Sequence, residues 1–475
     1  MSEALAYLSA SAALERFRRR ELSPVELMRA LLERAERAVA SINATTAIHA
    51  EQALERAELA EARYRQGNAR ALEGVPVAIK DETAVAGWRR TIGSWLHDEV
   101  PTENHPLVDR LLAAGAIPHL QTSVPEYCVL GQTWSARFGV TRNPWNSAVT
   151  VGGSSGGSGA ALAAGLAPLA SGSDMAGSIR IPAAQCGLYG YKPPFGRLAS
   201  TPGEELFSFA VEGPMARTLE DLIRMQNVIA GPHPASYTGM PFEPSPERYP
   251  GLDGRRLAYA FTTGCRRLCP EIRANLERAL AAFEAQGAVL LPVELDWDNG
   301  EIGAVLLEAI FGMHFNEYLE EVGETELVRA SSYLRWLIAR HRGRPNSILK
   351  AAALATRLHR ELQTKVWDRG CQALICPTLF TTAVPAELDP SRTPTVDIDG
   401  LAVDSLLGWV GTPPFNLLSR YPALAVPTGL TAAGVPTSLQ IVGPPFDDAA
   451  VFAVAWHHAA RGSELYTSRF PQNPA

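Results

Sequence analysis

The chain is poor in cysteine, with six residues of this type among 475. None of them forms a Cys-x2-Cys pair, so the sequence indicates neither a disulfide framework nor a zinc ribbon. Cys265 and Cys269 are four residues apart, but no second pair of histidines or cysteines accompanies them. A metal site at this pair is therefore not expected, and no other motif implies a metal or an organic cofactor.

Long apolar runs and an excess of positive charge are also missing. No stretch reaches 18 apolar residues, since Gly165 and Pro168 interrupt the longest candidate. The N-terminus lacks the basic and then apolar pattern of a signal peptide. The net charge of −7 disfavours a nucleic-acid surface, and the basic cluster 18–20 fits a solvated helix face. We therefore expect a cytoplasmic protein that binds neither membranes nor nucleic acids.

Apolar periodicity predicts an α/β protein. Residues 1–66 have a helical pattern, and Ser23-Pro24-Val25-Glu26 has the form of a capping box at the start of a helix. From residue 67 onward, short β-rich runs such as Val75–Ile79 alternate with Ala- and Leu-rich helical stretches. This alternation is typical of a sheet covered by helices.

Residues 300–370 are long, amphipathic and helical in pattern. Their aromatic residues fit two interpretations, core packing between helices or a helical cap over a substrate pocket. The aromatic residues in question are Phe311, Phe315, Tyr318, Trp336 and Trp367. Strand-like runs return at 373–377 and 423–427, so we expect a helical insert within a single domain of residues 1–475.

The segment 151–187 has the most unusual composition of the chain, being rich in glycine and serine. A flexible linker is disfavoured because the glycines run directly into a helical stretch at 160–164. A phosphate-binding loop is disfavoured because Gly157 is followed by Ser158 and not by lysine. Gly153–Gly157 does match the G-x-S-x-G pattern of a nucleophile loop centred on Ser155.

That pattern is also compatible with a second hypothesis, an α/β-hydrolase-type esterase with Ser155 as its nucleophile. Such an enzyme needs a downstream histidine at a triad corner, and His359, His457 and His458 do not lie in a loop of this kind. A second serine loop, 173–180, ends a predicted strand with small residues followed by Ser178. Small residues allow backbone N–H groups to converge on a developing oxyanion, as acyl transfer requires.

These motifs together resemble the amidase signature family, and they occur in a fixed order over much of the chain. They are GVPVAIKD at 74–81, QTSVPEY at 121–127, TRNPWN at 141–146, the Gly-Ser segment, YGYKPPFGR at 189–197, GPMARTLEDL at 213–222, PALAVPTGL at 422–430 and SLQIVGPPFDD at 438–448. The resemblance implies a mixed central sheet surrounded by helices, with a signature core at 67–230 and an insert that caps the active site.

The resemblance also implies a Ser-Ser-Lys triad. Ser178 would be the acylated nucleophile, Ser154 a bridging serine held by a cis peptide bond, and Lys80 the base. Backbone N–H groups of the loop would form the oxyanion hole, and neighbouring side chains would support it. The implied donors are Met175, Ala176, Gly177 and Ser178, and the supporting residues are Ser155, Asp174 and Arg180. Family members usually have two glycines before the nucleophile, whereas this chain has Ala176-Gly177.

A lysine can act as a base only when it is neutral, and at pH 7 roughly one free lysine in a few thousand is neutral. We expect burial at the end of an apolar strand to disfavour the Lys80 ammonium and to increase that fraction. The alternative for Lys80 is a structural salt bridge to Asp81 or Glu82. The relay predicts an acyl-enzyme intermediate and a neutral-to-alkaline pH optimum.

The substrate is expected to be a small molecule with an amide-type bond. Aryl or alkyl amides, carbamates (a urethanase activity) and esters are all compatible with the chemistry, and Tyr127, Gly131 and Gln132 are candidates for lining the acyl side. A second hypothesis is an amidotransferase A-type subunit that releases ammonia from glutamine with a partner chain. The sequence leaves the oligomeric state open, including a homodimer.

Overall fold

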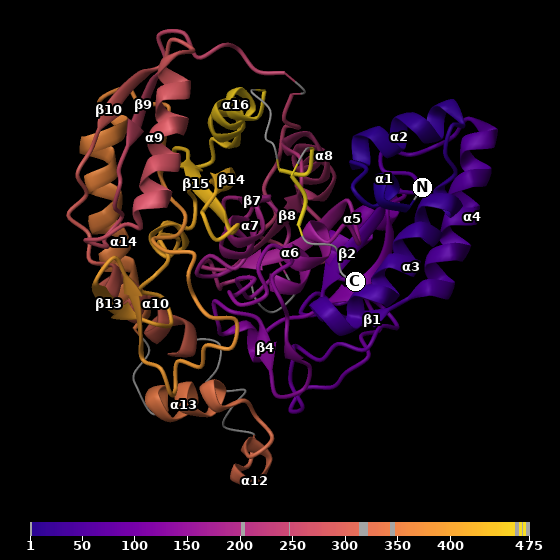
Figure 1. Ribbon diagram of the computed structural model, residues 1–475, viewed down its shortest axis with the longest axis horizontal. Helices are drawn as coiled ribbons and strands as arrows, with labels where there is room; N and C mark the ends of the chain where they lie inside the picture. The colour runs from indigo at the N-terminus through magenta and orange to yellow at the C-terminus, as the bar shows by residue number, and fades with distance from the viewer. Residues whose placement is uncertain are drawn as a thin grey trace.

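The computed structural model in Figure 1 describes residues 2–200, 205–246, 248–312, 322–342, 347–460, 465–467 and 469–471. Phe315 and Tyr318 of the predicted insert lie outside these residues. Among the described helices, none is both long and apolar enough to cross a membrane.

A large mixed sheet forms the centre of the molecule. Its eleven strands lie in the order β1-β3-β2-β6-β8-β7-β14-β15-β11-β9-β10. They are β1 (Thr45–Ile48), β2 (Pro76–Lys80), β3 (Ile117–Thr122), β6 (Leu169–Asp174), β7 (Tyr189–Lys192), β8 (Val211–Ala216), β9 (Arg256–Tyr259), β10 (Val289–Pro292), β11 (Ala373–Pro377), β14 (Ala423–Leu430) and β15 (Pro436–Val442). Two short hairpins stand apart, β4 (Trp134–Ser135) with β5 (Gly139–Val140), and β12 (Thr395–Ile398) with β13 (Leu401–Asp404).

The sheet contains two groups of parallel strands separated by a run of antiparallel pairs, and β1 pairs antiparallel with β3 at one edge. Strand β2 is parallel to both β3 and β6, and β9 is parallel to both β10 and β11. The strands between these two groups, from β6 to β11, pair antiparallel. The predicted α/β class with a mixed central sheet is confirmed.

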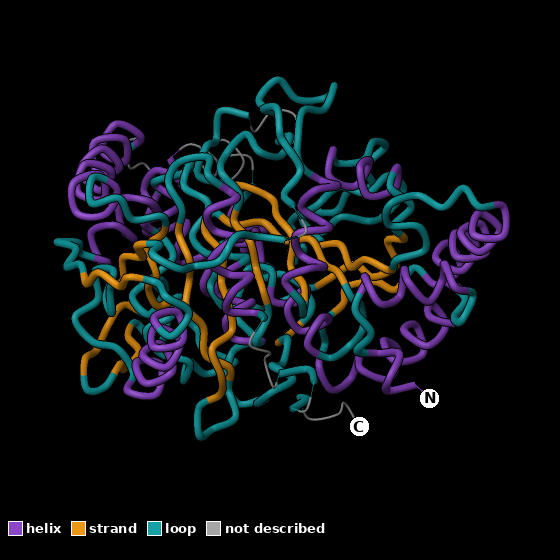
Figure 2. Tube along the Cα trace, turned by 90° about the horizontal axis from the view of Figure 1, so that it is seen from above, coloured by secondary structure: helices purple, strands orange, loops and turns teal. Residues whose placement is uncertain are grey.

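Helices lie on both sides of the sheet (Figure 2). They are α1 (Ser2–Ala6), α2 (Ala10–Arg19), α3 (Pro24–Ile42), α4 (Ala50–Gln66), α5 (Pro106–Ala113), η1 (Glu126–Cys128), α6 (Gly156–Ala163), α7 (Arg180–Cys186), α8 (Leu219–Ile229), α9 (Pro270–Glu284), α10 (Asn299–Ile310), α12 (Glu324–Leu327), α13 (Ser332–His341), α14 (Ile348–Leu362), η3 (Gln363–Trp367), α15 (Pro414–Leu417) and α16 (Asp448–Ala459). The capping box at Ser23 and Glu26 starts α3 as predicted.

The Gly-Ser segment forms one of the most buried parts of the chain. Every residue of α6 is buried, as is every residue of α7. The glycines of α6 permit close packing, because a Cβ at Gly156 would lie 2.1 Å from the Thr133 Oγ1 atom and one at Gly157 would lie 2.3 Å from the Ser123 backbone nitrogen. The segment therefore holds two loops against the sheet and does not act as a flexible linker.

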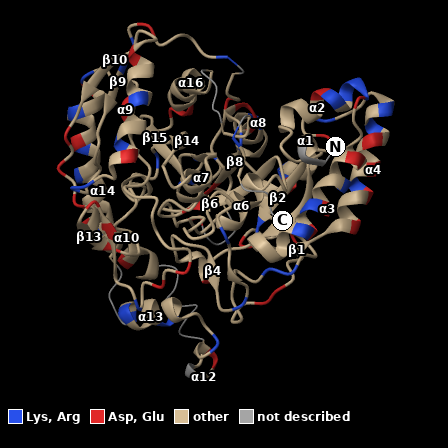
Figure 3. Ribbon diagram, in the orientation of Figure 1, with Lys and Arg blue, Asp and Glu red and all other residues tan. Residues whose placement is uncertain are grey.

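Most charged residues lie on elements away from this centre (Figure 3). Lys, Arg, Asp and Glu cover the outer helices α2–α4 at one end of the molecule and α9 and α14 at the other. The helices α6 and α7 next to β6 are mostly uncharged. An ion pair between buried side chains near β6 is therefore unusual for this part of the molecule.

The described part of the predicted insert contains α10, α12, α13, α14 and the π-helical turn η3. Its α13 docks on the residues that follow β3. The Tyr333 hydroxyl donates to the Trp134 carbonyl oxygen at 2.9 Å and accepts the Glu126 backbone N–H at 2.6 Å. The Glu126 side chain in turn accepts the Ser331 backbone N–H at 2.5 Å. The insert is thereby attached to the segment that contains Tyr127.

Candidate active site

Lys80 is the last residue of β2, and its side chain has no exposed surface. Its apolar neighbours in the strand place β2 in the interior of the sheet, between β3 and β6. The strand end therefore directs a long basic side chain into a buried space. The Lys80 backbone N–H donates to the Ser171 hydroxyl of β6 at 3.0 Å, which ties the two strand ends together.

Three oxygen atoms surround the Lys80 amine. The Nζ atom donates to the Ser154 hydroxyl at 2.8 Å and to the Ser173 hydroxyl at 2.6 Å. It also lies 2.9 Å from the Glu82 Oε2 atom. The amine thus has both the bridging-serine contact that the resemblance implied and the salt bridge that was its structural alternative.

Ser154 is held next to Lys80 by a tightly packed loop. The Gly153–Ser154 peptide bond is cis. A Cβ at Gly153 would lie 2.7 Å from the Gln132 carbonyl oxygen, so only glycine fits at this position. Ser154 is 1% exposed, and its hydroxyl faces the Lys80 amine without bulk water around it.

Ser178 lies on the loop between β6 and α7. Its backbone carbonyl accepts the Ser155 N–H at 3.1 Å, which brings Ser178 beside the Ser154 and Lys80 pair. Ser178 is 8% exposed, more than Ser154. Three residues that lie up to 98 positions apart in the sequence, Lys80, Ser154 and Ser178, are therefore brought to the ends of β2 and β6 and to the start of α6.

The backbone N–H groups of this loop have different partners. The Gly177 N–H donates to the Asp174 Oδ1 atom at 2.8 Å and is therefore engaged. Within the described part of the chain, no hydrogen bond engages the N–H groups of Met175, Ala176 or Ser178. Gly177 has a φ of 123°, whereas Ala176 does not have a positive φ. A methyl side chain at position 176 is therefore compatible with the loop.

Asp174 and Arg180 form a buried brace under the loop. The Arg180 Nε atom lies 2.9 Å from the Asp174 Oδ2 atom, and Arg180 Nη2 lies 3.0 Å from Oδ1. Asn416 adds a hydrogen bond of 2.9 Å to the same carboxylate. Burial alone would raise the pKa of Asp174, but the Arg180 guanidinium and these hydrogen bonds hold the pKa below its usual value.

The electrostatics of Lys80 differ from the sequence-based expectation. Burial lowers the pKa of the Lys80 amine, as expected, but the Glu82 carboxylate 2.9 Å away opposes this effect, and the pKa is raised. The pKa of Glu82 is lowered: burial opposes this shift, and the Lys80 ammonium and the Ser173 hydroxyl overcome it. The sequence analysis expected burial to increase the neutral fraction of Lys80. Burial does act in that direction, but the net shift is opposite because a carboxylate lies beside the amine.

Two further side chains belong to this cluster and were missed from the sequence. Ser173 donates from its hydroxyl to the Glu82 Oε2 atom at 2.5 Å. The Cys128 thiol contacts both Ser154 and Glu82. Burial and the Glu82 charge raise the pKa of Cys128, so this thiol is not a thiolate nucleophile. The alternation Ser171-Gly172-Ser173 in β6 was a usable signal for Ser173, since such residues share one face of a strand.

The Ser155 hydroxyl is hydrogen-bonded to the backbone of β6. Its hydroxyl accepts the Ser173 backbone N–H at 3.3 Å and donates to the Ser173 carbonyl at 3.4 Å. The candidate histidines of the α/β-hydrolase hypothesis have contacts elsewhere: His359 with the Tyr421 hydroxyl, His457 with the Pro250 carbonyl and His458 with the Pro427 carbonyl. These contacts do not support a catalytic histidine next to Ser155.

The three candidate substrate residues lie close to the same loops. Tyr127 is 9% exposed and has a φ of 52°. Gly131 packs near Trp409, to which a Cβ would come within 3.3 Å. The buried Gln132 donates to the Ser405 carbonyl at 3.4 Å, while its Oε1 atom has no partner among the described residues. The contact of these residues with a substrate stays a prediction.

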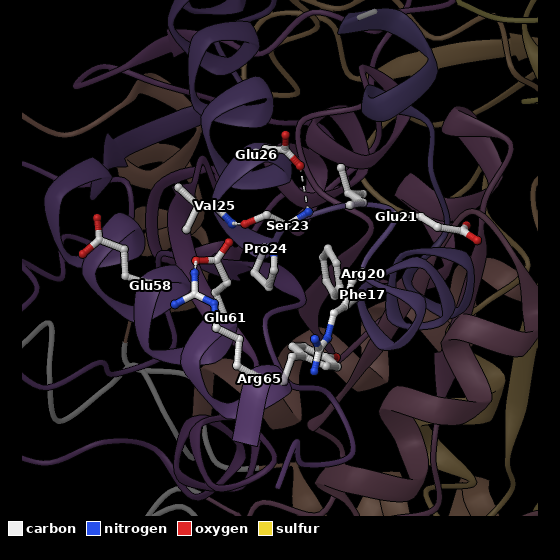
Figure 4. Close-up of a pocket in the computed structure, with 12 residues that line it drawn as sticks. Phe17, Arg20, Glu21, Ser23, Pro24, Val25, Glu26, Glu58, Glu61 and Arg65 are labelled. Atoms are coloured by element: carbon white, nitrogen blue, oxygen red, sulfur yellow. Dashed lines mark hydrogen bonds and ion pairs between the residues drawn. The ribbon is translucent and has the colours of Figure 1, made fainter. Parts of the chain in front are cut away.

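The pocket drawn in Figure 4 is separate from this cluster. It has a volume of about 750 Å³ and is lined by residues of α2, α3 and α4 and of the turn between α2 and α3, among them Ser23, Glu26 and Glu61. Figure 4 shows the Ser23 and Glu26 contact of the capping box at its wall. None of the lining residues is Lys80, Ser154 or Ser178. In the described ranges, no group of histidine, cysteine and acidic side chains is arranged to hold a metal ion.

Comparisons with known proteins show the family to which the chain belongs. A family model described as Amidase matches residues 26–452. An acylamidase from Rhodococcus erythropolis is 33% identical, over 95% of this chain and 94% of its own length. The A-type subunit of the glutamyl-tRNA(Gln) amidotransferase from Ralstonia pickettii is 31% identical, over 92% of this chain and 96% of its own length.

Solved structures show the same fold. A bacterial aryl acylamidase of the amidase signature enzymes superposes with a TM-score of 0.86 at 26% identity, covering 99% of this chain and 98% of that one. A 6-aminohexanoate cyclic dimer hydrolase superposes with a TM-score of 0.86 at 25% identity, covering 99% and 100%. On its sequence motifs, its fold and these matches, the chain belongs to the amidase signature family of amide hydrolases.

Proposed function

We propose that this enzyme cleaves the C–N bond of small amides through an acyl-enzyme on Ser178, with Ser154 and Lys80 as a proton relay. The observation that carries the proposal is the hydrogen bond of 2.8 Å between the Lys80 Nζ atom and the Ser154 hydroxyl, in a buried setting beside the Ser178 loop. A serine hydroxyl becomes a competent nucleophile only when a base accepts its proton.

In the proposed reaction the free Lys80 amine accepts the Ser154 proton while Ser154 accepts the Ser178 proton. The Ser178 oxygen then attacks the carbonyl carbon, and the N–H groups of Met175, Ala176 and Ser178 are placed to stabilise the oxyanion. Gly177 is not assigned as a donor, because its N–H already binds Asp174. Collapse of the intermediate breaks the C–N bond, and the leaving amine takes back the proton through Ser154. Water releases the acid by the same relay.

The reaction requires the unprotonated Lys80 amine. The Glu82 carboxylate beside Lys80 raises the pKa of the amine despite its burial, so the free amine forms mainly on the alkaline side of neutrality. We therefore expect an activity that increases from neutral to alkaline pH. An optimum on the acidic side of neutrality would contradict Lys80 as the base.

The proposed substrate class is apolar acyl or aryl amides, with carbamates or esters as side substrates. Met175 and Ala176 of the nucleophile loop pack against a hydrophobic cluster that includes Tyr127, Leu130 and Phe209. An apolar surface beside the nucleophile favours an apolar group on the substrate. The likeness to an acylamidase and an aryl acylamidase supports this choice.

The test is covalent labelling with a fluorophosphonate, measured by intact mass. Wild-type protein and Ser155→Ala are expected to gain one adduct, and folded Ser178→Ala none. Ser155→Ala is the matched control, because its hydroxyl belongs to the same pair of loops but binds the Ser173 backbone. Loss of labelling in Ser155→Ala with labelling kept in Ser178→Ala would move the nucleophile to Ser155 and favour the esterase hypothesis.

An amidotransferase subunit is the second candidate, since relatives with that role are 31% identical over nearly the full chain. The two hypotheses differ in their need for a partner. Hydrolysis of an aryl amide by the purified chain, with no added protein and no ATP, would favour the independent amidase. Release of ammonia from glutamine only after a partner chain is added would favour the alternative.

A further inference from the structure

Glu82 is placed to control the charge of the proposed base. It follows Lys80 by two residues, and its Oε2 atom lies 2.9 Å from the Lys80 Nζ atom. The same oxygen accepts the Ser173 hydroxyl at 2.5 Å, and Ser173 accepts a hydrogen bond from Lys80 at 2.6 Å. Lysine, serine and glutamate thus form a closed triangle on the side of the amine that also reaches Ser154.

The surroundings leave Glu82 as the main counter-charge of this amine. Lys80 has no exposed surface, whereas 30% of the Glu82 side chain is exposed. Asp81 turns away, since its carboxylate accepts from Thr91 at 2.6 Å and from Gln121 at 2.6 Å. Cys128 faces the pair as a thiol, and the Arg90 guanidinium reaches the Glu82 backbone carbonyl at 3.3 Å. A buried ammonium requires a paired carboxylate to be stable.

We propose that Glu82 is a positioning residue whose carboxylate keeps Lys80 protonated and aligned in the free enzyme, so that the relay becomes active only when the pH removes this proton. The inference rests on the proposed function of Lys80. It predicts that Glu82 sets the pH at which the enzyme becomes active. The residue does not touch the substrate in this role.

The direction of the effect follows from charge. Removing the carboxylate removes a stabilising partner of the ammonium, so a neutral residue at position 82 lowers the pH at which Lys80 loses its proton. Glutamine keeps a similar shape and can still contact Ser173. The pH dependence should therefore change more than the maximal rate.

The experiment measures the rate of fluorophosphonate labelling of Ser178 as a function of pH, which needs no knowledge of the substrate. In Glu82→Gln we expect the acid limb of the profile to move down by at least about one pH unit, with the plateau rate within about tenfold of wild type. Glu82→Asp, which keeps the charge, should have a limb closer to that of wild type. Glu99→Gln is the control, because Glu99 pairs with Arg90 in the following loop and does not contact Lys80.

Each outcome decides the inference. An unmoved acid limb in Glu82→Gln, or a shift of equal size in Glu99→Gln, would overturn the role of Glu82 while leaving the proposed function intact. Absence of labelling in wild-type protein at every pH would overturn the proposed function and this inference with it. If Glu82→Gln does not fold, Glu82→Ala provides the same test, since it also removes the carboxylate that lies beside the Lys80 amine. A downward shift would support the inference, and an unchanged limb would contradict it.

Discussion

Lys80 and Lys192 are both buried residues at strand ends, yet their amines have different surroundings. Lys80 faces the Glu82 carboxylate and Cys128, and its pKa is raised although burial opposes this. Lys192 donates only to neutral oxygens among its described hydrogen bonds, the carbonyls of Pro193 at 3.1 Å and Ser419 at 3.4 Å. Burial then dominates and lowers the pKa of Lys192 to about 7. At the residue scale, the nearest carboxylate decides the charge of a buried amine.

Replacing Lys80 tests the base directly. We expect Lys80→Met to lose at least about 1,000-fold in the rate of Ser178 labelling at alkaline pH, because it removes the amine that is hydrogen-bonded to Ser154. Lys365→Met is a matched control, since Lys365 pairs with Glu361 in a partly exposed setting far from the relay in sequence. Wild-type labelling by folded Lys80→Met protein would remove Lys80 from the mechanism.

The buried Lys192 amine should make the free energy of unfolding of the protein depend on pH. Its folded-state pKa of about 7 lies below the usual value of 10.5, so between these values the unfolded chain binds a proton that the folded chain does not. The free energy of unfolding should therefore rise with pH in this window, by up to about 1.4 kcal/mol per pH unit from this one group. Lys192→Met should have a flatter dependence, measured by urea unfolding at pH 7 and pH 9. Parallel curves for the two proteins would contradict a neutral buried Lys192.

At the scale of elements, the loop from β6 to α7 is organised around one carboxylate. Asp174 accepts from Arg180 and Asn416 and from the Gly177 N–H, so a single side chain joins β6, α7 and α15. Thr412 adds a hydrogen bond of 2.6 Å to the Ala176 carbonyl. The loop conformation is thereby set by buried polar contacts as well as by its own residues.

Breaking the brace should be strongly destabilising. Arg180→Met leaves the Asp174 carboxylate buried and unpaired, which costs about 3–5 kcal/mol. Arg224→Met is the control, since Arg224 and Glu220 form a partly exposed pair worth under about 1 kcal/mol. The measurement is chemical unfolding at pH 7. Because the folded pKa of Asp174 is lowered, its contribution is present above its unfolded pKa near 3.9 and is lost only as the pH falls through the folded value.

Gly177 predicts a steric effect in the same loop. Its φ of 123° favours glycine, and a Cβ there would lie 2.1 Å from the Thr412 Oγ1 atom. We expect Gly177→Ala to reduce Ser178 labelling more than 100-fold by displacing the loop (about 2.7 kcal/mol in the barrier). Ala176→Gly is the control, because Ala176 does not need a positive φ. Labelling of Gly177→Ala at the wild-type rate would show that the loop tolerates the methyl group.

At the scale of the whole molecule, the helical insert is attached to the signature core through a few buried polar groups. Tyr333 of α13 is fully buried and bonds both the Glu126 N–H and the Trp134 carbonyl. Its ring packs edge-on against Trp134, with ring centroids 4.7 Å apart. The segment 126–134 thus contacts the insert on one side and Gly153 on the other. Whether the insert also caps the active site stays a prediction.

Tyr333→Phe tests this attachment. Removing the hydroxyl leaves a buried N–H and a partly buried carbonyl without their partner, at a cost of about 1–3 kcal/mol. We expect faster amide hydrogen exchange in α13 and in the segment 126–134, with little change in α16. Tyr237→Phe is the control, since Tyr237 is 74% exposed. Equal exchange in Tyr333→Phe and wild type would show that apolar packing alone holds the insert.

The sequence by itself determined the class of fold, the family and the candidate triad. Apolar periodicity and helix capping depend on residues that are close together in the sequence. They can therefore be recognised without a structure, as the capping box at Ser23 shows. The motifs of the Gly-Ser segment are contiguous, and their order was sufficient to indicate the amidase signature. The tight packing of Gly156 and Gly157 agrees with a segment in which small residues are required.

Only the tertiary structure showed that a carboxylate lies beside Lys80 and which N–H groups of the nucleophile loop are already hydrogen-bonded. The lysine at the end of β2 could have been neutral or paired, and the choice depended on where the Glu82 and Ser173 side chains point. The Gly177 N–H was a candidate oxyanion donor until it was seen to bind Asp174. Electrostatic energies change over a few ångströms, and those distances are set by strands and loops that are remote in the sequence.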